Sequence, residues 1–397
     1  MNPAPDTIPR REFFAINGLR FFAATWVLLF HASIHFGQLS TASLIQPILN
    51  QGVLAMTLFF MLSGFILSYR YSCFATRDSV HEYISARIGR LYPVYLFMGL
   101  TTIWRIGEGA GKFVIIEQYG YLGAVPFAMF AIFLFVFALQ AWFPNLFGIW
   151  NFGGSWSLSV EAFFYSLFPT VRQTIRRLSD RTLRMVTYAL PLTIGLISFG
   201  LLVSETRATD NSKMFYVLPI FRLPEFLFGM CGYAMFVERK LDQRILAWLS
   251  AMAIPVLVVG IYWRDLPGLI EWGAPASVVF MGFFVACLSL DATQIVKTVV
   301  NYLGRISYCV YMAQFTTIPI LKRVGDQWSV EFNWAILVSA TFLLAVATYH
   351  LVEVLAYSRA RKLSERVTRK LSFILSDPQT AEQSGEPEPP VTRNLRS

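Results

Sequence analysis

The sequence predicts an all-α, polytopic integral membrane protein with about ten transmembrane helices. Hydrophobic residues make up 55% of the 397 positions and charged residues only 14%, so that the mean hydropathy is +0.53. There are 36 Phe and 10 Trp residues, which is far from the balance of a soluble domain. The hydrophobic residues also gather in runs of about 20, the length that a helix needs to cross a bilayer.

The apolar residues form eleven segments in chain order, at residues 16–36, 51–70, 91–106, 121–141, 156–171, 185–204, 217–237, 245–263, 271–290, 305–321 and 331–355. Clusters of arginine and lysine precede the first segment and follow the second and the fifth, and loops of this kind usually face the cytoplasm. If every basic cluster faces that side, both termini are cytoplasmic and the number of crossings is even. We therefore expect ten crossings, with 121–141 as a re-entrant or interfacial element.

One transmembrane domain accounts for most of the chain. We expect a cytoplasmic segment at 1–13, a transmembrane domain at 14–358 and a basic, disordered cytoplasmic tail at 359–397, whose end is polar and rich in Pro and Glu. The formal net charge of +9 is explained by cytoplasmic loops, so we expect a lipid bilayer and no nucleic acid as a partner. Three of the four cysteines lie in apolar segments, which argues against a disulfide framework.

The first span carries two groups that hydrocarbon penalises. Arg20 and His31 are eleven residues apart, which is three helical turns, so both lie on one face about 16 Å apart along the axis. Arg20, near the cytoplasmic end, is either a snorkelling anchor or part of a site. His31 lies in the outer part of the span, where an ionisable group usually faces the bundle interior and marks a function. The alternative is a structural histidine of the core with its hydrogen bonds satisfied.

Glu161 is the expected carboxylate partner of His31, because it lies a few residues into a span that begins on the outer side. There it would orient the imidazole and stabilise its protonated form, as a general base requires. The alternative is a carboxylate that is hydrogen-bonded to polar neighbours in an early helical turn. Arg222 and Glu225, three residues apart in a later span, are expected to pair on one face in a structural or a catalytic role.

A second group of arginines indicates chemistry on the inner side. Arg87 and Arg90 are three residues apart in a basic loop just before the third span, and with Arg20 they would form a cationic mouth that faces the cytoplasm. Arginine side chains suit phosphate groups well, because their planar donors bind two oxygens at once. A positive loop that only sets the topology would have the same pattern, so both interpretations stay open.

Six motifs in this order resemble the signatures of the membrane acyltransferase-3 family of inner-membrane O-acyltransferases, over most of residues 14–358. They are INGLRFFAATWVLLFH with Arg20 and His31, AMTLFFMLSGFILS with Ser63, ARIGRLYPVY with Arg87 and Arg90, WSLSVEAFFYSLFP with Trp156, Ser157 and Glu161, RLPEFLFGM with Arg222 and Glu225, and LGRISYCVYMAQF. Each motif alone has low specificity, but the shared order makes the resemblance strong.

The resemblance implies a reaction and its parts. Such proteins move an acyl group, commonly acetyl, from cytoplasmic acyl-CoA to a hydroxyl of a surface or exported carbohydrate or glycolipid. Arg20, Arg87 and Arg90 would then hold the CoA phosphates. His31 would be the general base or a transient acyl acceptor, with Glu161 beside it. We expect acetyl-CoA as the donor substrate, no permanently bound cofactor and no metal. Supporting or substrate-contacting residues would be Ser63, Trp156, Ser157, Arg222 and Glu225.

Two features depart from the family pattern. Family members often have a histidine near the end of the LGRISY span, where this chain has Gln314, so no second catalytic histidine is expected there. Relatives with an additional soluble, hydrolase-like domain also differ from this chain, whose tail is short. An acceptor that needs such a domain is therefore not expected, and the sequence leaves the acceptor, the acyl length and the oligomeric state open.

Two other functions fit parts of the same pattern. A proton-coupled exporter of a glycan or lipid precursor would use the same embedded ionisable groups, but such transporters more often show a topological repeat, which we do not find. A catalytically silent assembly factor for envelope polysaccharides would not need His31. Consumption of acetyl-CoA with formation of an ester distinguishes the enzyme from both.

Overall fold

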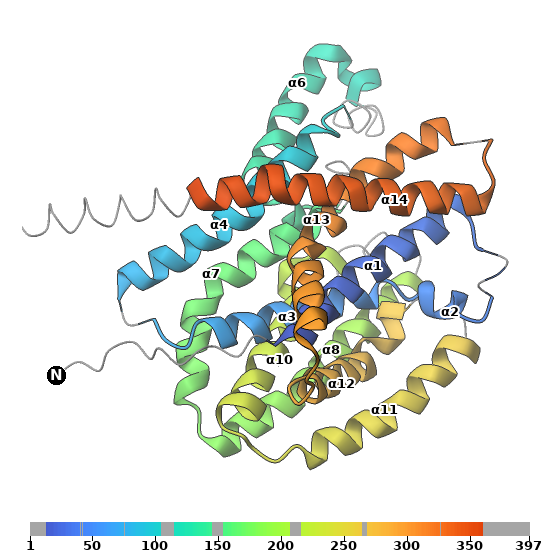
Figure 1. The fold of residues 1–397 in the computed structure, drawn as a ribbon. Helices are drawn as coiled ribbons and strands as arrows, with labels where there is room; N and C mark the ends of the chain where they lie inside the picture. Colours follow the sequence, from blue (N-terminus) through green and yellow to red (C-terminus); the bar gives the residue numbers. More distant parts are fainter. Residues whose placement is uncertain are drawn as a thin grey trace, which may run out of the picture.

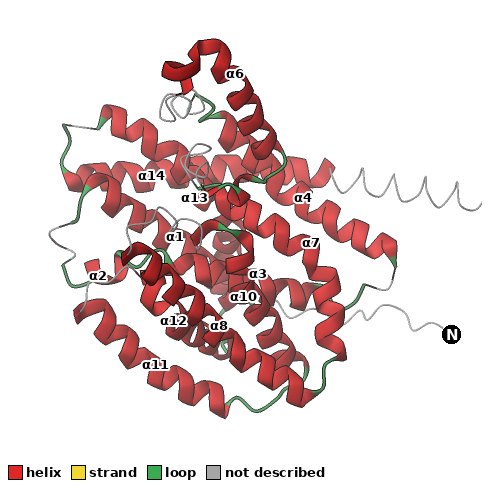
Figure 2. Ribbon diagram, turned by 180° about the vertical axis from the view of Figure 1, so that it is seen from behind, coloured by secondary structure: helices red, strands yellow, loops and turns green. Residues whose placement is uncertain are grey.

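The computed structural model describes residues 13–359 except 40, 42, 75, 105–114, 145–153, 207–215, 264–267 and 326. Within these residues every regular element is a helix (Figure 2), which confirms the predicted all-α class. The first seven elements are α1 (Phe14–Phe36), α2 (Gln46–Leu49), α3 (Leu54–Arg70), α4 (Arg77–Leu100), α6 (Ile115–Val136), η2 (Gln140–Trp142) and α7 (Trp156–Arg177). The others are α8 (Asp180–Thr206), α10 (Pro219–Gly232), η5 (Tyr233–Glu238), α11 (Arg244–Trp263), α12 (Gly268–Cys287), α13 (Gln294–Val324), α14 (Val330–Thr348) and η6 (Tyr349–Glu353).

Two helices form the centre of the bundle. α1 contacts α13, α3 and α14, whereas α3 contacts α10 and α12 (Figure 1). α12 also packs against α8 and α11, and α11 lies at the periphery because it contacts little except α12. The first span, which carries Arg20 and His31, is therefore surrounded by other helices.

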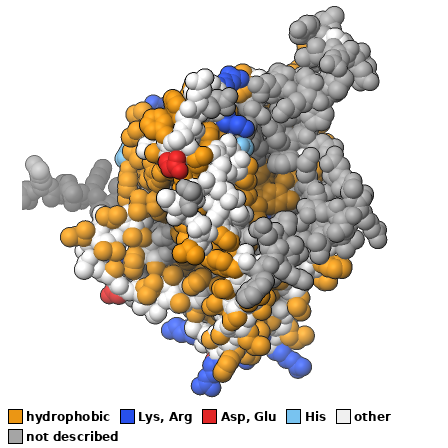
Figure 3. Space-filling model, turned by 90° about the vertical axis from the view of Figure 1, so that its right-hand side faces the viewer, with side chains coloured by type: hydrophobic (Ala, Val, Ile, Leu, Met, Phe, Trp, Pro, Cys, Tyr) orange, Lys and Arg blue, Asp and Glu red, His pale blue; other side chains and the backbone are white. Residues whose placement is uncertain are grey.

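The helices have the lengths and composition of membrane spans. Five of those described are long and apolar enough to cross a bilayer, at Phe14–Phe36, Asp180–Gly200, Pro219–Glu238, Arg244–Tyr262 and Val330–Arg359. Shorter apolar helices cover Leu54–Arg70, Val125–Val136 and Gly273–Cys287. Apolar side chains cover much of the face in Figure 3, while Lys and Arg side chains lie near its upper and lower edges. The chain is therefore a membrane protein, as its composition predicts.

Proline occurs inside most of the long helices without ending them. The examples are Pro93, Pro126, Pro169, Pro191, Pro224, Pro255, Pro275 and Pro319. In water an interior proline costs a helix about 3 kcal/mol. Membrane helices tolerate it more often, because neighbouring helices and side-chain hydroxyls satisfy the freed carbonyl groups.

The segment with Arg87 and Arg90 is helical, so the sequence prediction of a basic loop is wrong. α4 begins after Thr76, which forms a reciprocal capping box with Ser79. The helix then continues through the basic residues and through Pro93. Charge alone does not interrupt a helix, and the cap rather than the first apolar residue sets its start. The two arginines therefore lie on one face of a rigid element.

The segment at 121–141, expected to be re-entrant or interfacial, is divided between α6 and η2. α6 extends from one edge of the bundle (Figure 1). Its carboxyl end is held on α4, because the Tyr95 hydroxyl donates to the Phe135 carbonyl oxygen at 2.5 Å and Tyr92 donates to that of Val136. Many of its apolar side chains are exposed. That this segment does not cross stays a prediction.

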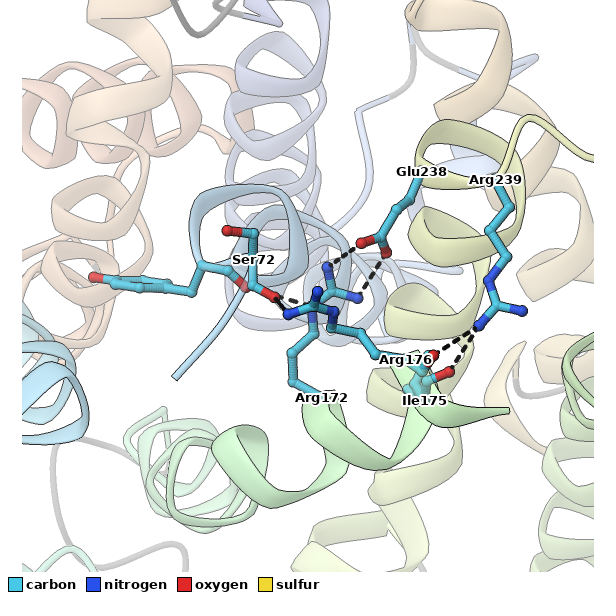
Figure 4. Close-up of polar contacts among 7 residues, drawn as sticks. Ser72, Arg172, Ile175, Arg176, Glu238 and Arg239 are labelled. Atoms are coloured by element: carbon cyan, nitrogen blue, oxygen red, sulfur yellow. Dashed lines mark hydrogen bonds and ion pairs between the residues drawn. The ribbon is translucent and has the colours of Figure 1, made fainter. Parts of the chain in front are cut away.

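On one side of the bundle, arginine side chains form hydrogen bonds and ion pairs between helix ends (Figure 4). The buried Arg172 guanidinium of α7 donates to both carboxylate oxygens of Glu238, at the end of the π-helix η5, at 2.9 and 3.1 Å. Arg239 donates to the carbonyl oxygen of Ile175 at 3.1 Å, which satisfies the last turn of α7. Arg172, which follows the fifth apolar segment, and Arg239, which follows the seventh, therefore hold helix ends in place.

α3 and α10 touch through their backbones at two glycines. A Cβ atom on Gly64 would lie 2.1 Å from the carbonyl oxygen of Phe226, and one on Gly229 would lie 2.0 Å from that of Met61. Small residues permit such close approach between membrane helices. This contact places the Arg222 and Glu225 side chains of α10 directly against α3.

Candidate active site

His31 faces α13 from the second half of α1. Its Nδ1 atom lies 2.9 Å from Oε1 of Gln314, a fully buried side chain of α13. The ring of Phe315 packs edge-on against the imidazole, with ring centroids 5.2 Å apart. The partner of His31 is thus the residue at which the sequence expects no second catalytic histidine. The sequence marks Gln314 only as a departure from the family pattern; its position as a polar side chain within an apolar span is the signal that could have marked it as a partner of His31.

The Gln314 amide fixes the tautomer of the neutral imidazole. Its Nε2 donates to the carbonyl oxygen of Tyr311 at 2.9 Å, which leaves Oε1 to face His31. Since an amide oxygen can only accept, the proton of the neutral ring lies on Nδ1. The lone pair is then on Nε2, on the other side of the ring. This arrangement leaves His31 able to accept a proton at Nε2.

The predicted contact between Glu161 and His31 is not formed. The Glu161 carboxylate instead accepts from the Ser63 hydroxyl at 2.9 Å and from the Tyr165 hydroxyl at 2.9 Å. This is the alternative that the sequence leaves open, a carboxylate bonded to polar neighbours. The contact with Ser63 joins two motifs that lie 98 residues apart in the sequence.

The reason is that α7 begins inside the protein and not at its surface. Residues 154–160 are all buried, and a Cβ atom on Gly154 would lie 2.0 Å from the ring of Phe315. The start of α7 is therefore already next to the residue that packs on His31. Glu161, one to two turns further on, lies deeper than a count from the outer end of the span predicts.

A narrow middle cavity of about 60 Å³ brings six of the predicted residues together. They are Arg20, Ser63, Arg87, Arg90, Ser157 and Glu161. At this volume the cavity holds a few water molecules or a thin chain. Its far wall is fixed by a relay in which the Ser157 hydroxyl donates to the Tyr311 hydroxyl at 2.9 Å, and Tyr311 donates to the Gly154 carbonyl oxygen at 2.9 Å.

His31 lines a separate histidine cavity of about 220 Å³. Aromatic rings form much of its wall, from Phe30, Trp156, Tyr216, Tyr311 and Phe315. Trp156 packs against Tyr216 with ring centroids 4.8 Å apart. Met56 and Tyr311 line both this cavity and the middle cavity, so the two are neighbours.

On the other side of the middle cavity lies a mouth cavity of about 670 Å³. Its charged lining residues are Arg20, Arg70, Arg87, Arg90, Arg305 and Glu353. Ile66 and three of these arginines also line the middle cavity. Phe13 and Ser358, near the two ends of the described chain, line the mouth. The three cavities therefore follow one another from the chain ends to His31.

Arg222 and Glu225 form the predicted pair, which lies away from the three cavities. Arg222 lies 3.1 Å from Glu225, both side chains are 3% exposed, and Thr57 of α3 donates to the carboxylate at 2.8 Å. The guanidinium lies over the rings of Phe60 and Tyr216. Neither charged residue lines the three cavities. The pair therefore joins α10 to α3 behind the cavity wall.

Comparison with known proteins identifies the class. A family model described as an acyltransferase domain matches residues 13–350, and the chain belongs to this acyltransferase-3 family. The match runs from α1 into the start of η6, and so includes every residue that lines the middle and histidine cavities and most of those that line the mouth cavity. The family resemblance of the sequence motifs is thereby confirmed.

Two curated relatives cover most of the chain at low identity. Acyltransferase MdmB of Streptomyces mycarofaciens is 25% identical over 362 residues, which cover 84% of this chain and 87% of that protein. O-acetyltransferase OatA of Staphylococcus aureus is 21% identical over 370 residues, or 85% of this chain. Only 56% of OatA is covered, so the chain spans about half the length of that relative. No solved structure matches the chain.

A buried ion pair with a structural role predicts a specific pattern of stability. Glu225→Leu alone is expected to lower the free energy of unfolding by about 3–5 kcal/mol, because Arg222 becomes an unpaired buried charge. The double variant Arg222→Met, Glu225→Leu should regain most of this loss, because both charges are gone. Thermal unfolding of the purified protein measures both changes. A double variant with wild-type stability but no acyl transfer would instead place the pair in the chemistry.

Proposed function

We propose that this protein is an O-acyltransferase that moves an acyl group, with acetyl as the expected one, from acyl-CoA to a hydroxyl of a carbohydrate or glycolipid. The observation that carries the proposal is the row of three cavities, which leads from an arginine-lined mouth to a histidine with an available lone pair. The printed name of the relative OatA, an O-acetyltransferase, supports acetyl. A carbohydrate hydroxyl as the acceptor is what the family resemblance implies.

The donor enters at the mouth cavity. Coenzyme A carries several phosphate groups, and arginine binds phosphate through two parallel hydrogen bonds. Arg87 and Arg90 project from the rigid helix α4 and Arg20 from α1, so all three are held in place before the donor arrives. The thin pantetheine arm then occupies the middle cavity, whose small volume excludes the bulky nucleotide. This leaves the thioester near His31.

His31 acts as the general base. Nε2 takes the proton of the acceptor hydroxyl while the hydroxyl oxygen attacks the thioester carbonyl carbon. The C–S bond then breaks, and the CoA sulfur leaves as a thiolate that takes the proton back from Nε2. In the alternative, Nε2 itself attacks the carbonyl carbon, the C–S bond breaks and the CoA thiolate leaves. The acceptor hydroxyl then attacks the acyl group on Nε2, the N–C bond breaks, and the hydroxyl proton passes to the CoA thiolate. Gln314 serves both routes, because it keeps the proton of the neutral ring on Nδ1.

The same proposal assigns the sides of the membrane. Acyl-CoA is a cytoplasmic compound, so the mouth and the chain ends beside it face the cytoplasm of the cell's inner membrane. Ten crossings, with both termini inside, agree with this orientation. His31 lies about 16 Å further along α1 than Arg20, and the acceptor therefore reaches it from the outer side. The aromatic wall of the histidine cavity offers apolar faces to an acceptor ring.

Transfer of labelled acetyl groups tests the proposal. Membranes with equal amounts of wild type or His31→Ala receive acetyl-CoA labelled in the acetyl group and the host's envelope glycans, and alkali-labile ester is measured. We expect ester from wild type and a loss of at least about 10²-fold in the variant, the typical contribution of a general base. His35→Ala, one turn further along α1, is the matched control and should retain activity.

Equal ester from wild type and His31→Ala would remove His31 from the chemistry. No ester from either protein, with acetyl-CoA left unconsumed, would contradict acyl transfer and favour export of a precursor.

The role of Gln314 has its own test. Gln314→Met keeps the length of the side chain but removes the oxygen that accepts from His31. We expect kcat to fall by about 10², because the imidazole loses its fixed tautomer, while the KM for acetyl-CoA stays close to wild type. Gln314→His, which introduces the histidine that the family resemblance implies here, should recover much of the rate. Steady-state kinetics at equal protein stability measure both variants, and a wild-type kcat in Gln314→Met would disprove this role.

A further inference from the structure

The mouth cavity carries a strong excess of positive charge. Among the described residues that line it, the basic ones are Arg20, Arg70, Arg87, Arg90 and Arg305, and Glu353 is the one acidic residue. Cations that share one cavity repel one another, and a nearby anion lowers this cost. In the protein without donor, Glu353 is the anion that the chain itself supplies to the mouth.

Glu353 is held in place by two helices. Its Oε1 accepts from Nε of Arg90 at 3.3 Å, and its Oε2 accepts from the thiol of Cys309, on α13, at 3.2 Å. The carboxylate is 7% exposed and the Arg90 side chain 18% exposed, so the ion pair lies at the buried edge of the mouth.

A local change of helix type places this carboxylate. α14 passes into the π-helix η6 at Tyr349, and Glu353 is the last residue of η6. A π-turn adds one residue to the turn and therefore changes the direction in which the following side chains project. Glu353 is buried, whereas its neighbours Val354 and Leu355 are exposed. The π-turn thus directs one acidic side chain of the last helix toward the arginines.

A phosphate group of the donor competes directly with this carboxylate. Both anions bind the same guanidinium donors, but a phosphate brings more acceptor oxygens and often more charge. Arg90 lines both the mouth and the middle cavity. It therefore lies next to the junction between the nucleotide and the pantetheine arm of the bound donor.

We propose that Glu353 is the resident counter-ion of the donor site: it pairs with Arg90 in the empty protein and yields Arg90 to a phosphate group of coenzyme A when the donor binds. This inference rests on the proposed function, because it takes the mouth as the donor site. Glu353 thereby sets the affinity for the donor. It makes the empty mouth stable and also makes the donor and its product, free coenzyme A, bind less tightly.

Binding of free coenzyme A to the purified, full-length protein tests the proposal. Glu353→Gln keeps the shape of the side chain but removes the charge. We expect the variant to bind coenzyme A with a Kd about tenfold lower than wild type, equivalent to about 1.4 kcal/mol, because no ion pair has to be broken. Calorimetric titration at constant ionic strength measures both values.

Glu238→Gln is the matched control. Glu238 also ends a π-helix and pairs with a buried arginine, Arg172, but it does not line the mouth cavity (Figure 4). Both variants should melt at a lower temperature than wild type, because each leaves an arginine without its counter-ion. Coenzyme A should raise the melting temperature of Glu353→Gln by more than it raises that of wild type or of Glu238→Gln, because in the latter two proteins the ion pair of Arg90 and Glu353 still has to break.

The outcomes separate this inference from the proposed function. If wild type binds coenzyme A and Glu353→Gln binds it equally or more weakly, the counter-ion role is wrong while the donor site stands. If neither protein binds coenzyme A, the donor assignment itself is wrong and the inference fails with it. Tighter binding by Glu353→Gln together with its larger rise in melting temperature on adding coenzyme A supports both.

Discussion

Hydrocarbon does not tolerate unpaired charge, and this constraint determines where the polar groups of the protein lie. Arg20, Glu161 and Glu353 lie on three different helices, and each of them lines the middle or the mouth cavity. The two carboxylates have partners on neighbouring helices, since Ser63 donates to Glu161 and Arg90 pairs with Glu353. The cost of burying charge thus favours placing these side chains along one internal path, while the ion pairs Arg222–Glu225 and Arg172–Glu238 lie outside it.

The path changes in character along its length. It begins as a wide, cationic mouth, narrows to a polar constriction and ends in a cavity with aromatic walls around His31. Under the proposed function these parts do different work: the mouth supplies affinity for an anionic donor, the constriction admits only a thin chain, and the aromatic walls limit access of water to the thioester. At one end Gln314 sets the tautomer of His31, and at the other end Glu353 lowers the affinity of the mouth for the donor by competing for Arg90.

Residue spacing predicts features that lie within a single helix. The sequence therefore indicates the apolar spans, and it places Arg20 and His31 on one face. It also predicts the pair of Arg222 and Glu225. Contacts between helices depend on depth and rotation, which residue spacing does not record. The depth of Glu161 is misjudged because α7 starts inside the fold, against Phe315. For the same reason, the sequence does not predict that Gln314 of α13 contacts His31 of α1. It also does not predict the π-turn that directs Glu353 toward Arg90.

The central claim is that the donor enters on the side of the chain ends and the acyl group leaves toward the other side. Reconstitution into vesicles, with the orientation of the protein established by cleavage of a terminal tag, tests this most directly. Labelled acetyl-CoA is supplied either to the side that carries the termini or to the opposite side, and the acceptor glycans are present on both. The account predicts ester only when the donor is on the terminal side; equal ester from either side, or ester only from the opposite side, would contradict it.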